Sequence, residues 1–584
     1  MTIADNLILL NSTKQDIKAA IEAKGVSMTD VPFTDYDTKI GEISGGGSIP
    51  IIPDYTPWTR PTDWLTLPTV LASDDEQIIM LVRVDDTTYN ELIFSMQGAY
   101  TVDWGDGTVE DYANGAIAYH NYDYANTELD GTVTSDGYKQ AICKVTLQAA
   151  GTTFTRIDFN TSSGRISNTR NHPIIDIIIH SRNPTTFLLG GNATTAFSLC
   201  EQVTLVTYDR TTASNIFNGF SNLQKLVLQN NALNNITSAD NMFLNCYSIK
   251  QIPSFNTTNI TTANGMFSAC AALVEIGAMS FDYDNAVLNN LFSSCYSIVD
   301  LRHITIANPS NLATAFSGCS SLMYGTTFTT TANCTNFLNT YYGCQSLLEL
   351  PSNLDMSAAT LCTSAFYNCM SLKSAPALTI NALSVASLFS QCFSLQTIGT
   401  FSAPSATTVS SLFYQCFSLD LSKQTITLPS ATNATSTFNQ LGSVKISFSG
   451  TADITNTSSM FAASNVYTLR DVTLSAPFVN VTNCSSMFNG QRLLDAVEIS
   501  TFTTNGSAST TNMFSNCYNL KKIILGGFNQ TFTIAGCSLG AAELDALYTS
   551  LGTVSGKTIT VSGNPGTSGD DPTIATTKGW TVVG

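Results

Sequence analysis

The sequence predicts a mainly β protein with short helices, in which an N-terminal helical segment and an antiparallel β-sandwich precede a long repeat solenoid. Three observations lead to this prediction. An aromatic residue recurs about every 24 to 25 residues over much of the 584-residue chain, which is typical of a solenoid. Charged residues make up roughly a fifth of the chain before about residue 190 and about a twelfth after it, which indicates a boundary. Strand-like alternation of apolar residues is concentrated before that boundary.

The composition excludes several classes of function. Only 12% of the residues are charged, and the formal net charge is −18 with a pI near 4.5. Nucleic-acid phosphates and anionic membrane surfaces both require Lys and Arg, so we expect neither nucleic acid nor a membrane as a partner. No run of about 18 apolar residues occurs, so no membrane-spanning helix is predicted. The opening stretch MTIADNLILLNSTKQD has a short apolar run after an Asp and does not fit a secretory signal.

Residues 1–45 are predicted to form a helical segment with two short helices. The pattern Ser12-x-x-Gln15 fits a capping box, and Gly25 fits the end of the first helix. Both helices are too short to be stable alone, so we expect the segment to dock on a partner or to oligomerise. Residues 46–58, which include SGGGSIP, form a linker. Residues 1–45 resemble the N-terminal segments of phage tail-fibre and other virion structural proteins, which implies that they anchor the chain in a particle.

Residues 59–168 are predicted to form the β-sandwich. The stretches QIIMLVRV, ELIFSMQG, AYTVDWGDGTVEDY and AICKVTLQ have the pattern of antiparallel strands. The motif VDWGDGT resembles the core of PKD-type immunoglobulin-like domains, and YHNYDY resembles the His-x-Tyr strand that follows it in that family. The stretch between the two motifs departs from the family in length, which leaves the strand order open.

Four acidic residues in and after this motif have two interpretations. Calcium binding is one, because this ion prefers carboxylate oxygens. A Gly-Asp-Gly turn with solvated acids is the other, and it is favoured because the spacing is not that of an EF-hand loop. We therefore predict no metal site and no cofactor. The four residues are Asp103, Asp106, Glu110 and Asp111.

Residues 169–526 are predicted to form the solenoid. The repeating aromatic residue is Phe197, Phe217, Phe243, Phe267, Phe292, Phe316, Tyr341, Phe366, Phe389, Phe413, Phe438, Phe461, Phe488 and Phe514. In most repeats a cysteine follows three residues later, and an aliphatic residue follows after three more. Because a repeat cannot bury its apolar stripe alone, equivalent positions should stack between neighbouring coils as three buried ladders.

The cysteines at this position are interpreted as buried free thiols. They are Cys200, Cys246, Cys270, Cys295, Cys319, Cys344, Cys369, Cys392, Cys416 and Cys517. Cysteine suits a ladder because it is small, polarizable and often buried. The other repeats have Phe220, Leu441, Ser464 or Gln491 at this position. No Cys-x-x-Cys pair or Cys/His cluster occurs, which argues against zinc. Cys334, Cys362 and Cys537 lie off the ladder, where an exposed cysteine could still pair.

The repeats also predict local structure and a family. The segment after each cysteine, such as YSIKQI, is predicted to be a short strand, and stretches such as SNLATAF to enter a short helical turn that ends at the aromatic residue. NTTNITTANGMFSACAALVEI and VTNCSSMFNG resemble BspA-type leucine-rich repeats, and more closely the surface-protein repeats of mycoplasmas, gut bacteria and their phages. The resemblance implies a right-handed leucine-rich-repeat solenoid with a parallel sheet on one face. It also implies adhesion and recognition.

Residues 527–584 are predicted to cap the solenoid, because a repeat array needs a distinct terminal unit. GAAELDALYTSL should form an amphipathic helix with Leu544, Leu547 and Leu551 on one side. GTVSGKT is one residue short of a phosphate loop and follows a helix where the motif requires a strand. A phosphate site is therefore excluded there.

The residue directly after the ladder cysteine is a candidate for ligand binding. It is aromatic in five repeats, as Tyr247, Tyr296, Phe393, Phe417 and Tyr518. On a strand it would point outward, and an exposed row of aromatic rings can bind sugar rings or form protein hot spots. The favoured alternative is that these rings pack on one another or face a partner subunit.

The sequence contains no evident catalytic constellation. No G-x-S-x-G motif occurs, and none of the four histidines neighbours a cysteine nucleophile motif. A glycan-cutting enzyme needs paired carboxylates, whereas Asp282, Asp284, Glu349 and Asp355 are isolated and differ in repeat register. We therefore expect a protein that is not an enzyme.

These observations favour a phage virion structural protein, a tail fibre, spike or head fibre, that mediates host recognition and adhesion. Residues 1–45 would bind other virion proteins, and the solenoid would bind a host cell-surface glycan or protein through many weak contacts. We expect a homotrimer that is made in the host cytoplasm and located in the virion as an extracellular particle. The alternatives are a bacterial cell-surface BspA-like adhesin, a purely structural or decoration protein of the virion, and a glycan depolymerase.

Overall fold

The computed structural model describes residues 56–584 apart from gaps at 87–89, 160–171, 183, 190–196, 352, 422–425, 442–444, 449–453, 464–468 and 475–477. The chain divides into two units, residues 1–52 and 53–584. The predicted helical segment 1–45 and most of the predicted linker 46–58 lie outside the described residues.

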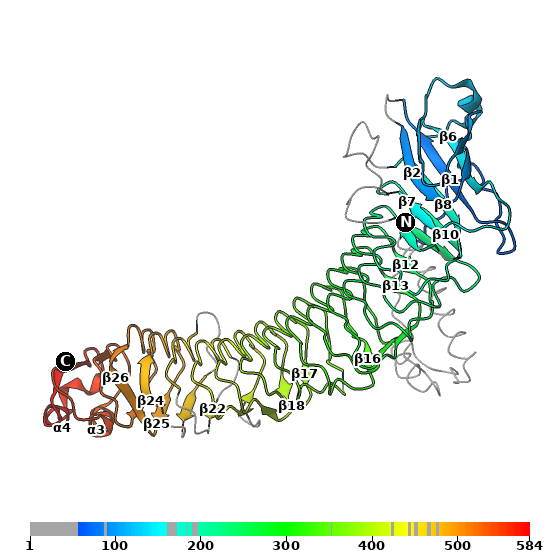
Figure 1. The fold of residues 1–584 in the computed structure, drawn as a ribbon. Coiled ribbons are helices and arrows are strands. Elements are labelled where there is room, and N and C mark those ends of the chain that lie inside the picture. The colour runs from blue at the N-terminus through cyan, green and yellow to red at the C-terminus, as the bar shows by residue number, and fades with distance from the viewer. Residues whose placement is uncertain are drawn as a thin grey trace, which may run out of the picture. The chain divides into compact units, whose positions relative to one another are not determined.

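Two β-sheets form the first part of the second unit (Figure 1). The seven-stranded sheet has the order β11-β10-β8-β1-β6-β3-β4, and the four-stranded sheet has the order β5-β2-β7-β9. Their strands are β1 (Gln77–Val84), β2 (Glu91–Gln97), β3 (Tyr100–Asp103), β4 (Val109–Tyr112), β5 (Ile117–Asn121), β6 (Lys139–Leu147), β7 (Arg156–Asp158), β8 (Ile174–His180), β9 (Thr186–Leu188), β10 (Gln202–Thr207) and β11 (Lys225–Leu228). A 3-10 helix, Thr127–Thr132, precedes β6. The ring of Phe94 on β2 lies 5.8 Å from that of Trp104, which follows β3, so the two sheets pack against each other.

Both sheets pass from antiparallel pairing into parallel pairing. β1 pairs antiparallel with β8, and β8 pairs parallel with β10. In the other sheet β7 pairs antiparallel with β2 and parallel with β9. Sheet hydrogen bonding therefore continues across the boundary that the sequence predicts at residues 168 and 169, and one buried core extends through both parts. The immunoglobulin-like, PKD-like assignment of the first part stays a prediction.

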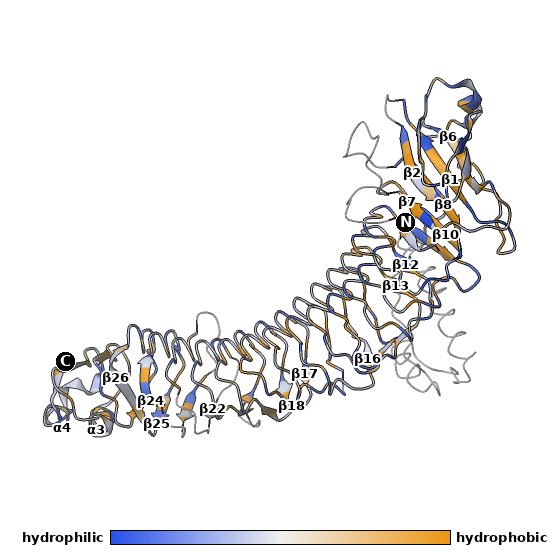
Figure 2. Cartoon of the chain, viewed as in Figure 1, coloured by the Kyte–Doolittle hydropathy of each residue, from blue (hydrophilic) through white to orange (hydrophobic). Residues whose placement is uncertain are grey.

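Residues 56–71 cover the outer face of the seven-stranded sheet. Figure 2 shows apolar residues along β1, which is buried on both faces. On the outer face, Leu81 packs under Trp64, and Ile79 packs under Val70. A two-sheet fold with one wet face would leave these positions polar. The covering segment therefore explains the apolar run QIIMLVRV, which the sequence interpretation assigned only to a sandwich strand.

An ion pair fastens this covering segment to the sheet. Arg60 Nε lies 2.9 Å from Oδ2 of Asp176 on β8, whose side chain is only 1% exposed. The guanidinium group also donates to the carbonyl oxygens of Trp64 and Leu65. Burial raises the pKa of Asp176, and Arg60 acts against that rise. The carboxylate is therefore stabilised by one arginine that comes from a distant part of the chain.

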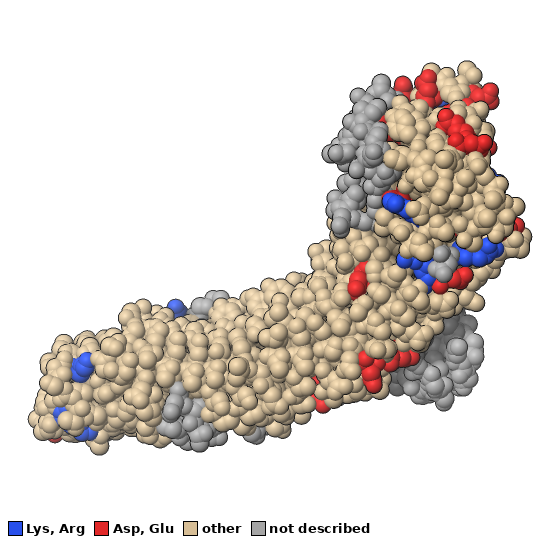
Figure 3. All heavy atoms as spheres, viewed as in Figure 1, with Lys and Arg blue, Asp and Glu red and all other residues tan. Residues whose placement is uncertain are grey.

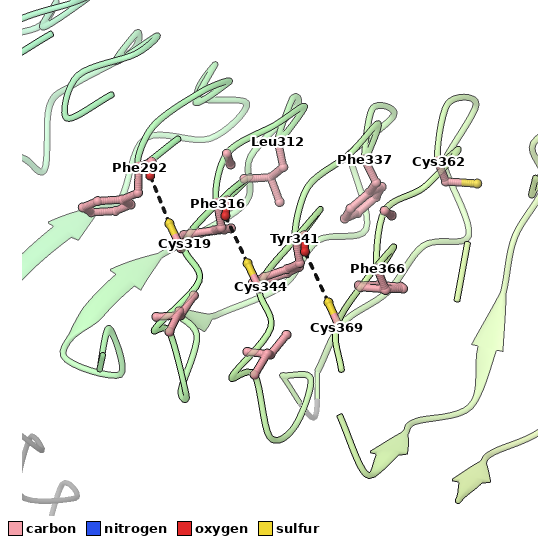
Figure 4. Close-up of a cluster of buried hydrophobic side chains, with 14 of the residues drawn as sticks. Phe292, Leu312, Phe316, Cys319, Phe337, Tyr341, Cys344, Cys362, Phe366 and Cys369 are labelled. Atoms are coloured by element: carbon pink, nitrogen blue, oxygen red, sulfur yellow. Dashed lines mark hydrogen bonds between the residues drawn. The ribbon is translucent and has the colours of Figure 1, made fainter. Parts of the chain in front are cut away.

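The predicted aromatic ladder runs through the solenoid. From Phe217 to Phe514, rings of successive coils stack with centroid distances between 4.8 Å and 6.2 Å. Figure 4 shows Phe292, Phe316, Tyr341 and Phe366 in this arrangement. All these rings are buried. Stacking buries a ring against the coil on either side, which a single repeat could not do.

The predicted helical turn before each aromatic residue is wrong. The segment is a run of turns in which successive backbone N–H groups donate alternately within their own coil and to the next coil. Met242 N donates within its own coil to Ala239 O at 3.2 Å, whereas Phe243 N donates to Met266 O of the next coil at 2.8 Å. Residues with a left-handed backbone conformation stand two positions before and two positions after the aromatic residue. Around Phe243 they are Asn241 (φ 54°) and Asn245 (φ 63°). Asn tolerates this region better than most residues, which explains the Asn-rich composition.

The solenoid strands are parallel and mostly shorter than predicted. The first group is β12 (Gln251–Ile252), β13 (Glu275–Ile276), β14 (Met279–Phe281), β15 (Ile304–Ile306), β16 (Thr327–Phe328), β17 (Ser374–Ala375), β18 (Leu378–Thr379), β19 (Thr397–Ile398), β20 (Phe401–Ser402) and β21 (Ile426–Thr427). The second group is β22 (Lys445–Phe448), β23 (Asp471–Leu474), β24 (Phe478–Asn483), β25 (Ala496–Ile499), β26 (Phe502–Ser509) and β27 (Lys522–Leu525). The pairs among them that follow successive coils are parallel, which confirms a mainly β solenoid.

The chain ends in a small unit that continues the stacking. It contains β28 (Phe532–Thr533), α3 (Ala541–Ser550), β29 (Lys557–Thr560), a 3-10 helix (Pro565–Ser568), α4 (Thr573–Thr576) and β30 (Trp580–Val583). The predicted helix is present as α3, and Leu544, Leu547 and Leu551 are all buried. Trp580 packs edge-on against Phe532 at 6.0 Å.

Candidate binding surface

Nine of the ten ladder cysteines are fixed by hydrogen bonds between coils, whereas Cys200 donates to Gln202 O of its own coil at 3.3 Å. Cys319 Sγ donates to Phe292 O at 3.0 Å, and Cys344 Sγ donates to Phe316 O at 3.1 Å (Figure 4). The same contact is made by Cys246, Cys270, Cys295, Cys369, Cys392, Cys416 and Cys517. All 15 cysteines are free and buried, as predicted for the ladder. Burial raises the pKa of the Cys319 thiol to about 12, so its role at neutral pH is structural.

In most coils the ladder position holds a side chain that donates a hydrogen bond, although Phe220 and Leu441, which occupy it in two other coils, have no donor group in the side chain. At the same position Gln491 donates from Nε2 to Phe461 O at 2.6 Å. Two different donors therefore reach equivalent carbonyl oxygens at this position. The sequence interpretation treated cysteine as a hydrophobic residue alone and missed the bond. Gln491 was the residue that could have pointed to it.

Three of the five aromatic residues predicted to form a row are exposed. Tyr247, Tyr296 and Tyr518 have exposed fractions of 49%, 52% and 55%. Phe393 and Phe417 are half-buried, and their rings stack 5.0 Å apart. All five lie in turns and not on strands as predicted, because the described strands begin several residues later.

The structure brings only two of these five residues together. In the intervening coils the same position has small or polar residues, among them Ala271, Ser320 and Gln345. Phe393 and Phe417 belong to successive coils and touch. Tyr247, Tyr296 and Tyr518 are therefore separate exposed rings and not parts of a continuous row.

A second set of aromatic residues occurs at another register position of the same region of the solenoid. Tyr342, Tyr367 and Tyr414 each directly follow the ladder aromatic residue, and Tyr342 and Tyr367 stack 4.8 Å apart. Burial raises the pKa of Tyr367, and the nearby Tyr342 and Tyr414 add to the rise. Ser390, at the same position of the coil between Tyr367 and Tyr414, is only 2% exposed. The aromatic pairs at 341–342, 366–367 and 413–414 could have revealed this set.

We call the resulting surface the aromatic strip, defined as Tyr342, Tyr367, Phe393, Tyr414 and Phe417. Its rings come from four successive coils and stand one or four residues after the ladder aromatic residue. Figure 3 shows few charged residues on the visible face of the solenoid. The aromatic strip belongs to the solenoid, in which about a twelfth of the residues are charged.

The acidic residues of the first part are engaged locally. Asp106 Oδ2 lies 2.8 Å from His120 Nε2, and Glu110 accepts a bond from Trp104 Nε1 at 3.0 Å. Asp111 accepts from a threonine hydroxyl, and Asp103 accepts from a backbone N–H two residues later. Within the part of the chain that the structure describes, no three His, Cys, Asp or Glu side chains gather as metal ligands would. In the same part no helix has the length and apolarity needed to cross a membrane.

The comparison with protein families gives a direct result. A family described as "Mycoplasma protein of unknown function, DUF285" matches residues 201–301, 310–450 and 432–531, which together make up just over half of the chain. The chain belongs to the DUF285 family. This finding agrees with the predicted mycoplasma-type, BspA-like repeats, and the first of the three DUF285 matches begins at residue 201, directly before β10. Among curated proteins none matches the chain.

Two solved structures resemble the DUF285 chain weakly. A leucine-rich repeat protein from Bacteroides ovatus is 15% identical, with a TM-score of 0.30, over 64% of this chain and 89% of that one. A chain of the TLR13-ssRNA13 complex is 12% identical, with a TM-score of 0.21, over 68% of this chain and 50% of that one. These TM-scores are too low to support an argument about function.

Proposed function

We propose that this DUF285 protein recognises and adheres to a cell surface through its solenoid, without catalysis. The observation that supports the proposal is the aromatic strip, in which five rings come from four successive coils of a sparsely charged solenoid. Aromatic faces at partly exposed positions are suited to sugar rings and to protein hot spots. Tyr247, Tyr296 and Tyr518 add exposed rings elsewhere along the solenoid.

The composition supports a host cell-surface glycan or protein as the proposed partner. The net charge of −18 disfavours nucleic acid and other polyanions. Ser, Thr and Asn side chains supply neutral donors and acceptors that suit the hydroxyl groups of glycans. Weak contacts at several coils would add up, and a homotrimer would multiply them further.

Binding to whole cells tests the proposal. Fluorescently labelled full-length chain is incubated with cells from the source culture, and bound fluorescence is measured by flow cytometry. We expect the double variant Tyr367→Ala, Phe417→Ala to lose most of the binding. The control is Leu361→Ala, which removes a 52% exposed apolar residue outside the aromatic strip and should bind like the parent. Equal binding by the double variant and the parent would contradict the proposed surface.

Two locations fit an adhesion protein of this kind, a bacterial cell surface and a virion. The DUF285 match favours a bacterial cell surface, because the matched family is described from Mycoplasma. The resemblance of residues 1–45 to tail-fibre segments favours a virion, as a receptor-binding or purely structural protein. Mass spectrometry of sedimented particles and of washed cell envelopes distinguishes the two locations. Peptides from the solenoid in the envelopes alone would exclude the virion, and peptides in the particles alone would exclude the bacterial surface.

A further inference from the structure

The chain contains five Asn-Gly dipeptides, and one of them has a different environment from the others. Their asparagines are Asn114, Asn218, Asn264, Asn489 and Asn505. In such a dipeptide the glycine nitrogen can attack the asparagine side chain, because glycine has no Cβ atom to hinder the approach. The attack requires a glycine N–H group that is free of a hydrogen bond, since the nitrogen must turn towards the side-chain carbon. The backbone hydrogen bonds of the five glycines therefore determine which dipeptide can react.

Four of the five glycine N–H groups donate to a backbone carbonyl oxygen of another strand or coil. The N···O distances lie between 2.7 Å and 3.0 Å in the pairs Gly115–Met96, Gly219–Leu244, Gly265–Asn289 and Gly490–Ser515. An attack by any of these nitrogens would first have to break a hydrogen bond of the fold and open the structure locally. The folded state therefore protects these four dipeptides.

Gly506 is the exception. It belongs to β26, near the C-terminal end of the solenoid (Figure 1), and lies between Thr504 and Ser509, the residues that pair with β24. Residues 505–507 are exposed, and no described residue accepts a hydrogen bond from the Gly506 N–H group. A Cβ atom added to Gly506 would meet nothing within 4 Å, so the space around this residue is open. Its nitrogen is therefore free to react in the folded state.

The side chain of Asn505 is folded towards the same stretch of backbone. Its Oδ1 accepts from Ser507 N at 3.2 Å and from Ser507 Oγ at 3.4 Å. This Asx turn keeps the Asn505 Cγ atom close to the peptide nitrogen of Gly506. The two donors also polarise the side-chain carbonyl group and stabilise the negative charge that an attack on Cγ places on Oδ1. In contrast, Asn114 Oδ1 accepts from Gly98 N, which comes from another part of the chain.

We propose that Asn505 is a site of spontaneous deamidation in the folded protein. Gly506 N bonds to Asn505 Cγ, the Cγ–Nδ2 bond breaks, and the proton of the Gly506 N–H group leaves with the amide group as ammonia. Water then opens the resulting succinimide ring at either carbonyl group, which gives aspartate or isoaspartate. Both products add a negative charge, and isoaspartate also lengthens the backbone of β26. Gln530 Nε2 donates to Gly506 O at 2.8 Å, so the longer backbone would disturb this contact between coils.

The test incubates the full folded chain at mildly alkaline pH, below its unfolding temperature, and follows its peptides by mass spectrometry over time. We expect the peptide with Asn505 to lose its side-chain amide, as a mixture of aspartate and isoaspartate, while the other four Asn-Gly dipeptides stay intact. The same incubation in urea is the control, because all five glycine N–H groups are free in the unfolded chain and all five sites should then convert. Isoelectric focusing of the folded chain should show a more acidic form that accumulates over the same period.

Two variants at exposed positions separate this chemistry from simple exposure. Asn505→Gln adds a methylene group, which prevents closure of the five-membered ring, so the acidic form should not accumulate. Ser507→Ala removes the hydroxyl donor to Oδ1 and should slow the conversion severalfold, because one hydrogen bond to the developing charge is lost. An intact Asn505 in the folded chain, or equal conversion of all five sites there, would overturn the proposal. Neither result would bear on the proposed adhesion, which depends on Tyr367 and Phe417.

Discussion

The two-sheet part and the solenoid use different means to hold one continuous core. In the two-sheet part each important contact occurs once, as with the buried Arg60–Asp176 pair and the Trp104 ring against Phe94. In the solenoid one contact set recurs, so that each coil repeats the stacked ring of the coil before it and most coils also repeat the thiol bond. Repetition makes stability nearly a sum over coils, whereas unique contacts make it depend on a few residues.

The largest expected difference between the two parts is their response to alkali. Burial raises the pKa of Cys319 and Cys392 from 9.0 to about 12, so the folded state keeps these protons between about pH 9 and pH 12 while the unfolded chain loses them. Below about pH 9 the contribution of each such thiol to the free energy of unfolding is fully present. Above about pH 9 that free energy falls by about 1.4 kcal/mol per thiol for each pH unit. Summed over several coils, this effect exceeds that of any single substitution.

Urea unfolding at about pH 8 and about pH 10 measures this effect. Circular dichroism follows the whole chain, and tryptophan fluorescence mainly follows the two-sheet part, since Trp58, Trp64 and Trp104 are three of the four tryptophans. We expect the dichroism midpoint to fall strongly at the higher pH and to recover on return to about pH 8. An unchanged midpoint would mean that the thiols titrate alike in the folded and unfolded states.

The second expected effect is the removal of one ring from the ladder. Phe292 stacks between Phe267 at 5.0 Å and Phe316 at 6.0 Å and is fully buried. Phe292→Ala should cost about 3–5 kcal/mol, because the surrounding coils cannot close the cavity. Tyr296→Ala removes an exposed ring of the same coil and should stay within about 0.5 kcal/mol of the parent. Urea unfolding followed by circular dichroism compares the two.

Hydrogen exchange shows whether the damage from Phe292→Ala stays local. In a one-dimensional array we expect faster exchange in the coils next to Phe292 and unchanged exchange in β1 and β6. Uniformly faster exchange through both parts would contradict the expected local effect, because it would show that the solenoid and the two sheets unfold as one unit.

Repetition also explains which features could be predicted from the sequence. The aromatic, cysteine and leucine positions were predicted correctly because each recurs in many coils and the period alone identifies its neighbours. The Arg60–Asp176 pair joins residues 116 positions apart and occurs once, so no pattern indicates it. The predicted helical turns in the coils were wrong and the strands are shorter than predicted, because left-handed residues such as Asn241 produce turns that apolar spacing does not reveal.

The candidate site divides in the same way. Five aromatic residues were identified from one register position, but exposure differs among them because neighbouring coils provide different side chains there. Tyr342, Tyr367 and Tyr414 were missed because a second register position had to be considered together with the first.

The third expected effect tests a unique contact of the two-sheet part. Arg60→Met leaves the 1% exposed carboxylate of Asp176 buried without its arginine and should cost about 3 kcal/mol. Without Arg60 the pKa of Asp176 should rise further above its usual value, so the deficit should be larger at neutral than at acidic pH. Arg470→Met removes a more exposed arginine, 3.7 Å from Asp495, and should change stability little. Tryptophan fluorescence during urea unfolding measures both variants.

The smallest expected effect concerns the thiol bond of the ladder. Cys319→Ala removes the donor to Phe292 O and should cost about 1 kcal/mol. Cys319→Ser keeps a donor at a similar place and should cost less, if the hydrogen bond matters more than apolar volume. The reverse order, with serine more damaging than alanine, would show that cysteine is retained for packing alone. The amide of Gln491, which reaches the equivalent carbonyl oxygen at 2.6 Å, favours the first order, because glutamine is larger than cysteine and shares with it only the ability to donate. Urea midpoints of the three proteins decide between the two explanations.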